Sequence, residues 1–229
     1  MGFCYGIDHA YFICSEKYEP DRYRHIQKWC TANNIKDYSF VYMKHGSEIS
    51  PEEAFKVYNP WVERPNVGEH KNFNRYNLKL SEISLCINFG TAALTAIKSG
   101  HKTVAIFESD AIFSDDFLQK FNACLRKLDG KEWDYLSIAD GVGMKPKRDP
   151  SDTETGWFPI LGNFHTRTTC GQVFKTDLLK NVMSSFFPFA EVLDWELNYQ
   201  LTRYGSRSLW LDPCLVKNGS CSGEFATSL

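Results

Sequence analysis

The stretch Thr103-Val104-Ala105-Ile106-Phe107-Glu108-Ser109-Asp110 decides how the rest of the chain is interpreted. Its first five residues are mostly β-branched or aromatic, which is typical of a buried strand. Two acids follow where the strand ends, and open α/β folds bind ligands at the carboxyl ends of their strands. Carboxylates at i and i+2 can hold a divalent cation, which can in turn carry a diphosphate. The pattern predicts transfer of a group from a nucleotide diphosphate. The alternative is a solvated strand end with two surface acids.

Strands alternate with helices on both sides of this stretch, which predicts an α/β fold with crossover helices. Strands are predicted over 10–15, 38–43, 103–107, 135–139, 172–174 and 209–211, and helices over about 20–30, 81–99, 115–128, 178–183 and 193–204. A loop is predicted over 59–77. Residues 140–169 show no clear period, and an irregular connection of that length is usually functional.

Length and composition limit the classes of protein to consider. The 229 residues suffice for one large domain, or one domain with a small extension. A net charge of −2 gives no sign of attraction to nucleic acid or to a membrane surface. The first residues do not resemble a signal peptide, and no segment approaches roughly 18 consecutive apolar residues. We therefore expect no nucleic-acid partner and no transmembrane segment.

The cysteines are interpreted as reduced thiols. There are 8 of them, several within apolar runs, and no CxxC pair occurs. Without a secretory signal, this usage predicts a cytoplasmic protein, in the bacterial cytosol or in a host cytoplasm if the gene is viral. A Cys214–Cys221 bridge is the alternative for that pair.

Several motifs, taken in chain order, carry a resemblance to a known family. They are Tyr11–Ser15 with Asp21-Arg22, Ser81–Leu85, Ile106–Asp110, Gly171–Thr176, Asp194–Leu197 and Asp212–Val216. In this order, over roughly 10–220, the chain resembles the family 25 glycosyltransferases, which include bacterial lipooligosaccharide galactosyltransferases and procollagen galactosyltransferase domains.

The resemblance implies a fold, a reaction and a cofactor. The implied fold is GT-A, a Rossmann-like mixed central sheet flanked by helices in a single domain over 1–229. Its donor-binding part would span about 1–140 and its acceptor-side part about 141–229. The implied reaction uses a UDP-sugar donor, a glycan or glycoprotein acceptor, and Mn²⁺ (or Mg²⁺).

The chain departs from the family pattern at three places. Ser109 stands where the family has the middle aspartate of its acidic motif. The family's Ser-His pair falls on Asn88-Phe89, and its cysteine falls on Leu85. These departures are compatible with altered donor choice, with weaker metal dependence, or with a divergent family.

The acids are the predicted metal and catalytic groups. Asp110 is the predicted metal ligand, and Glu108 is predicted to reach the metal, directly or through water, or to bond the donor's ribose or sugar. Ser109 lets the nucleotide approach closely, or is passive.

Inverting transfer needs a base for the acceptor hydroxyl, for which Asp194 is favoured. Glu196 is the alternative base, and a helix-dipole role for Asp194 is the third interpretation.

Other residues are predicted to contact the donor or the acceptor. On the donor, Arg22 is a predicted contact, Lys217 is predicted to meet the diphosphate, and backbone groups of Ile13, Cys14 and Ser15 are predicted to bind uracil. Four side chains of the irregular segment either stack on acceptor sugars or fill the core: Trp157, Phe158, Phe164 and His165.

The first hypothesis is therefore a metal-dependent inverting glycosyltransferase. The second is a catalytically inactive GT-A homologue that binds a glycan or protein partner, and the third is a nucleotidyltransferase. Motifs of P-loop, dinucleotide-binding, α/β-hydrolase and histidine-built zinc sites do not occur in the sequence.

Overall fold

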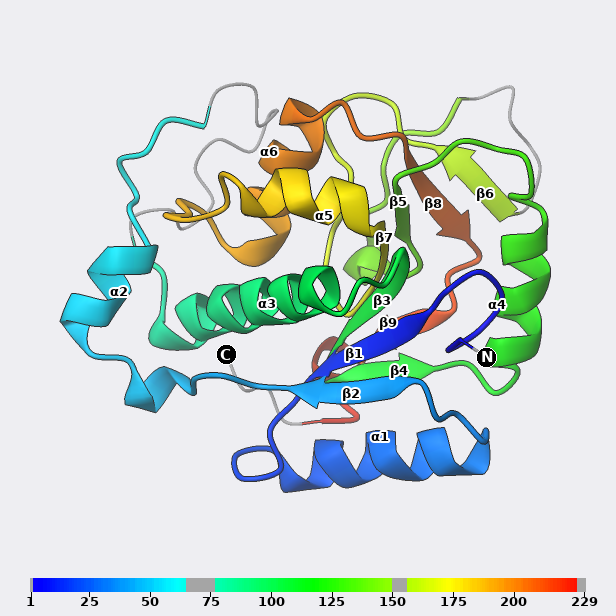
Figure 1. Ribbon diagram of the computed structural model, residues 1–229, viewed down its shortest axis with the longest axis horizontal. Helices are drawn as coiled ribbons and strands as arrows, with labels where there is room; N and C mark the ends of the chain where they lie inside the picture. The colour runs from blue at the N-terminus through cyan, green and yellow to red at the C-terminus, as the bar shows by residue number, and fades with distance from the viewer. Residues whose placement is uncertain (1, 65–76, 150–155, 226–229) are drawn as a thin grey trace.

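A seven-stranded mixed sheet forms the centre of the protein, with the strand order β2-β1-β3-β7-β5-β8-β6 (Figure 1). The computed structural model describes residues 2–64, 77–149 and 156–225. The strands are β1 (His9–Ile13), β2 (Tyr38–Val41), β3 (Thr103–Glu108), β5 (Tyr135–Ser137), β6 (Gly156–Pro159), β7 (Gly171–Lys175) and β8 (Ser208–Asp212). β1, β2 and β3 run parallel to one another, whereas β7 is antiparallel to both β3 and β5, and β6 is antiparallel to β8.

Helices cover both faces of this sheet. On one face lie α1 (Pro20–Ala32) and α4 (Phe117–Arg126), and on the other lie α3 (Leu80–Lys98), α5 (Thr176–Met183) and α6 (Leu193–Arg203) (Figure 1). The alternation of side chains along the strands explains the two layers. Phe12 and Phe107, with ring centroids 5.2 Å apart, belong to the core on the side of α1 and α4, whereas Tyr11 and Ile106 belong to the core on the side of α3. Each fully buried ring contributes roughly 2–3 kcal/mol.

A second, two-stranded sheet brings the end of the chain to the end of β3. It pairs β4 (Ala111–Phe113) with β9 (Val216–Asn218) in antiparallel fashion. The short α7 (Gly219–Ser222) follows directly. Residues near position 220 therefore lie beside the turn that carries the acids.

The predicted architecture, a mixed central sheet flanked by helices, is confirmed. Several short elements were not predicted, among them α2 (Pro51–Val57), β4, β6, β9 and α7. A capping box marks the start of α2, because Ser50 Oγ accepts from the Glu53 amide and Glu53 Oε2 accepts from the Ser50 amide. Of the predicted loop over 59–77, residues 65–76 lie outside the described residues, as do 150–155 of the predicted irregular segment.

All eight cysteines, each within the described ranges, carry free thiols, so the alternative Cys214–Cys221 bridge is wrong. By length and composition, α3 could cross a membrane, and it is the one helix in the described part of the chain that could. Half of its most apolar window is buried inside the protein, as in the core helix of a globular fold. The expected absence of a transmembrane segment stays a prediction.

Candidate functional site

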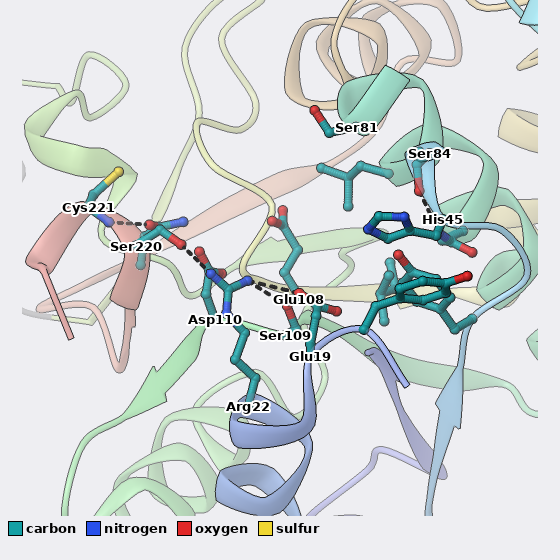
Figure 2. Close-up of a pocket in the computed structure, with 17 residues that line it drawn as sticks. Glu19, Arg22, His45, Ser81, Ser84, Glu108, Ser109, Asp110, Ser220 and Cys221 are labelled. Atoms are coloured by element: carbon teal, nitrogen blue, oxygen red, sulfur yellow. Dashed lines mark hydrogen bonds and ion pairs between the residues drawn. The ribbon is translucent and has the colours of Figure 1, made fainter. Parts of the chain in front are cut away.

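A pocket of about 220 Å³ opens where β1 and β3 end (Figure 2). Its lining comes from the end of β1, the start of α1, the segment after β2, the start of α3, the turn after β3, and the end of the chain. The lining residues are Ile13, Tyr18, Glu19, Arg22, Tyr42, His45, Gly46, Ser81, Ser84, Leu85, Asn88, Glu108, Ser109, Asp110, Asn218, Ser220 and Cys221. The pocket thus draws on residues 13–110 and on residues 218–221.

Both predicted metal ligands lie in this pocket. Glu108 ends β3 and accepts a hydrogen bond from the Thr169 hydroxyl. Burial, with the charge of Asp110 as the next cause, raises the pKa of Glu108 to about 8. Asp110 is only 5% exposed, and its Oδ1 has no hydrogen-bond partner among the described residues. A buried carboxylate oxygen without a partner is costly unless a ligand satisfies it.

The charges of the pocket favour a cation. Three carboxylates, of Glu19, Glu108 and Asp110, face one guanidinium, of Arg22. No group of three or more His, Cys, Asp or Glu side chains that could hold a metal exists in the described ranges. Two close carboxylates fit a hard divalent cation that takes its other ligands from phosphates and water. The residues present are therefore compatible with Mn²⁺ or Mg²⁺.

Arg22 joins three elements at one end of the pocket. Its Nη1 donates to Glu19 Oε1 at 3.0 Å and to Ser109 Oγ at 2.9 Å, and its Nη2 donates to Ser220 Oγ at 3.0 Å. Ser109 Oγ in turn donates to Glu19 Oε1 at 2.6 Å. An aspartate at position 109 would set two carboxylates side by side. The serine is therefore an integral part of this network.

The other predicted donor contacts divide into two groups. Ile13 lines the pocket, whereas Cys14 is buried and is not part of the lining. The Ser15 carbonyl accepts from the Glu19 amide at 2.8 Å, and its own amide faces Glu19 Oε2 at 3.5 Å, so the turn into α1 occupies its backbone groups. Lys217 is exposed and outside the lining, while its neighbour Asn218 lines the pocket.

Aromatic residues that the sequence did not single out form the opposite end of the pocket. The rings of Tyr18 and His45 stack with centroids 3.9 Å apart and planes 14° apart. α3 fixes the segment that carries His45, because Asn88 Oδ1 accepts from the Met43 amide at 2.6 Å and Ser84 Oγ donates to the Lys44 carbonyl at 2.6 Å. Asn88, the first of the two residues at the position of the Ser-His pair in the pattern described above, therefore shapes the pocket wall.

The two predicted base candidates lie outside the pocket lining. Asp194 Oδ2 pairs with the Arg167 guanidinium, and Oδ1 accepts from the Trp195 amide at 2.9 Å. The charge of Asp194 nevertheless contributes to the raised pKa of Glu108, so the two acids are near each other.

Glu196 is fully buried on α6. It accepts from Arg64 Nε at 3.0 Å, from the Ala190 amide at 2.9 Å and from Gln200 Nε2 at 2.9 Å. These contacts connect the segment before residue 65 to α6 and give Glu196 a structural role.

Of the four predicted acceptor-stacking residues, two fill the core. Phe158 is 1% exposed, and His165 is held by Ser208 Oγ at 2.7 Å and Thr202 Oγ1 at 3.1 Å. Burial lowers the pKa of His165 to about 4. Trp157 Nε1 donates to the Cys124 carbonyl at 2.8 Å, and Phe164 lies 5.8 Å from the Trp195 ring, both in partly buried positions.

No protein-family model and no curated protein matches the chain. Among solved structures, the chain is similar to A197 from STIV, with 12% identity and a TM-score of 0.46, over 89% of this chain and 81% of that one. It is also similar to TarS 1-349 from S. aureus, with 13% identity and a TM-score of 0.42, over 93% of this chain and 60% of that one. A third likeness is to mannose-1-phosphate geranyltransferase from Thermus thermophilus, with 11% identity and a TM-score of 0.28, over 57% and 46% of the two chains. Likenesses this distant carry no argument about the present chain.

Proposed function

We propose that the protein is a metal-dependent glycosyltransferase that moves a sugar from a UDP-sugar to a glycan or glycoprotein acceptor with inversion. The observation that carries this proposal is the buried Asp110 oxygen without a hydrogen-bond partner among the described residues, in an acidic pocket at the carboxyl ends of β1 and β3. The order of the motifs along the chain supports family 25 as the finer assignment.

The charge of the pocket makes a cation part of this proposal. A nucleoside diphosphate is an anion, and the carboxylates of Glu19 and Asp110, which outnumber the single guanidinium of Arg22, would repel it. Asp110 would hold Mn²⁺ or Mg²⁺ directly, and Glu108 directly or through water. When bound, the cation would neutralise the charge on the departing diphosphate.

The two ends of the pocket suit the two ends of the donor. Arg22 lies at the acidic end, where its guanidinium suits phosphate oxygens. Tyr18, Tyr42 and His45 line the other end and offer flat faces to a nucleobase. Ile13, at the end of β1, also lines the pocket.

The proposed base is Asp194. As the acceptor oxygen bonds to the anomeric carbon, the bond from that carbon to the diphosphate breaks and the hydroxyl proton passes to the Asp194 carboxylate. Because Arg167 pairs with Oδ2, this step requires the Arg167–Asp194 pair to open when the acceptor binds.

A second candidate function is binding without transfer. The observation that favours it is that both Asp194 oxygens are engaged and Glu196 is buried in its own ion pair. Such a protein would bind UDP with Mn²⁺ yet neither hydrolyse nor transfer the sugar of any UDP-sugar.

The test of the metal and donor site is Asp110→Asn, which keeps the shape of the side chain and removes its charge. Calorimetry with UDP and Mn²⁺ should show binding to the native protein and a loss of Mn²⁺-dependent binding in the variant. Asp115→Asn, an exposed acid outside the pocket lining, is the control. Unchanged Mn²⁺-dependent affinity in a folded Asp110→Asn protein would remove the proposal. A screen of UDP- and GDP-sugars for hydrolysis, with and without Mn²⁺, then identifies the donor.

A further inference from the structure

The segment Asn218–Cys221, near the end of the chain, forms one wall of the pocket. Figure 2 shows Ser220 and Cys221 beside Arg22 and Asp110, at the end away from His45 and Ser84. Two backbone contacts hold this wall in place: Asn218 is the register partner of Ala111, and the Gly219 amide donates to the Asp110 carbonyl at 2.8 Å.

Gly219 permits this close approach. A Cβ at this position would lie 2.8 Å from the Asp110 carbonyl oxygen and 2.7 Å from the Phe225 ring. Any larger residue would push the wall away from Asp110. The segment is therefore built to lie against the acid that the proposed function assigns to the cation.

The wall carries hydrogen-bond donors that the described residues do not use. Asn218 Oδ1 accepts from the Cys221 amide at 2.8 Å, which fixes the orientation of the side-chain amide. No described residue accepts from Asn218 Nδ2. Ser220 Oγ accepts from Arg22 Nη2, and its own hydroxyl hydrogen likewise has no acceptor in the described ranges.

We propose that Asn218 and Ser220 donate hydrogen bonds to the phosphate oxygens of the donor's diphosphate. This inference rests on the proposed function and deepens it, because it names the residues that receive the anion. Phosphate oxygens accept such bonds strongly. Both side chains are neutral, so they bind the anion without cancelling the negative charge of Asp110 that attracts the cation.

Strand alternation explains why these residues replace the predicted Lys217. In β9, Val216 and Asn218 are buried and Lys217 between them is exposed. The lysine therefore lies on the far side of the strand from the pocket.

The first test compares two serines of α7. Ser220→Ala should weaken the binding of Mn²⁺–pyrophosphate and of Mn²⁺–UDP about 10-fold, the effect of one hydrogen bond to a charged group. Ser222→Ala is the matched control, since Ser222 is outside the lining and bonds the Gly219 carbonyl at 3.3 Å. Because Ser220 Oγ also accepts from Arg22 Nη2, Ser220→Ala should lower the melting temperature slightly, so the affinities are compared at a temperature where both variants are fully folded. A purely structural role of Ser220 would lower the melting temperature and leave the affinity of the folded protein unchanged.

A second variant tests the amide. Asn218→Asp keeps an oxygen that can accept from the Cys221 amide, so α7 keeps its cap, while both amide donors are lost and a negative charge is added. Binding of Mn²⁺–pyrophosphate should fall by about 100-fold or more, because an unpaired donor is replaced by a repelling charge.

The third test needs no variant and no turnover. Cys221 is exposed and lines the pocket, so iodoacetamide should modify it in the free protein. Mn²⁺–pyrophosphate at ten times its dissociation constant should slow this modification about 10-fold by mass action. Cys214, half-buried and outside the lining, should show no protection.

The outcomes separate this inference from the proposed function. If Mn²⁺–pyrophosphate binds but neither protects Cys221 nor depends on Ser220 and Asn218, the wall does not receive the anion and the inference is wrong. In that case the metal and donor site at Asp110 still stands. If neither Mn²⁺–UDP nor Mn²⁺–pyrophosphate binds the native protein, both proposals are wrong.

Discussion

The guanidinium of Arg22 donates to the hydroxyl of Ser220 at 3.0 Å, although the two residues lie 198 positions apart. Arg22 belongs to α1, near the start of the chain, and Ser220 to α7, near its end. Arg22 also bonds Glu19 and Ser109, so one side chain joins the start of α1, the turn after β3 and the end of the chain. The pocket is therefore closed by a tertiary contact, and its geometry depends on that contact.

Arg22→Lys is expected to weaken the binding of UDP with Mn²⁺ about 10-fold, because an ammonium lacks the planar fork that reaches three partners at once. The modification of Cys221 in the free protein should also become faster, since α7 loses its contact with α1. Calorimetry and timed alkylation measure the two effects. Arg24→Lys, exposed and paired with Asp21, is the control, and equal affinities of the two variants would contradict this expectation.

Ser109→Asp is expected to destabilise the free protein by about 2 kcal/mol at pH 7, because it places a buried carboxylate beside the partly buried Glu19 and removes the hydrogen that Glu19 accepts. Ser109→Ala removes the same hydrogen without adding charge, and should cost less. Urea denaturation at low salt measures both. A Ser109→Asp protein as stable as Ser109→Ala would show that Glu19 does not constrain this position.

His165 is expected to make stability depend on pH. Burial lowers its folded-state pKa to about 4, below the 6.5 of an unfolded chain, so protonation favours the unfolded state. Its contribution is present above pH 6.5, falls as the pH decreases, and is lost by about pH 4. The difference between the two pKa values of His165 corresponds to about 3 kcal/mol in the free energy of unfolding.

His165→Asn should therefore lower the slope of stability against pH between about pH 4 and 6.5, measured by urea denaturation against the native protein, while the slope of opposite sign that the raised pKa of Glu108 contributes remains in the variant. The same substitution at the half-buried His25 is the control and should leave the slope unchanged. If the stability of the His165→Asn protein depends on pH as steeply as that of the native protein, other groups produce the pH dependence.

Local patterns were sufficient to predict part of the site. Glu108 and Asp110 follow an apolar run that is buried throughout. The end of a buried strand lies at the edge of its sheet whichever strands flank it, so these acids could be placed without knowing the strand order. Arg22 could be placed by the same reasoning, because it lies in the first turn of the helix that follows β1.

The remaining pocket residues depend on tertiary contacts that no local pattern contains. The hydrogen bond from Ser109 holds Glu19 in the pocket, and the pairing of Asn218 with Ala111 places Asn218 in the pocket wall. Lys217 was predicted because its charge suits a diphosphate, but side chains alternate along β9, so Lys217 is exposed and Asn218 lines the pocket. The capping box at Ser50 was a usable signal for α2 that the sequence interpretation did not use.

The choice between Asp194 and Glu196 as the base can be made by two isosteric variants. Asp194→Asn should reduce transfer by at least about 100-fold while leaving the affinity for UDP with Mn²⁺ within about twofold, because the residue lies outside the pocket lining and would act on the acceptor. Glu196→Gln should instead lower the free energy of unfolding by about 3 kcal/mol, since it leaves the Arg64 charge buried without its counter-ion. Transfer per folded molecule should be retained in Glu196→Gln. If Glu196→Gln abolishes transfer at native stability while Asp194→Asn transfers normally, the roles are reversed, and α6 must turn its other face to the acceptor.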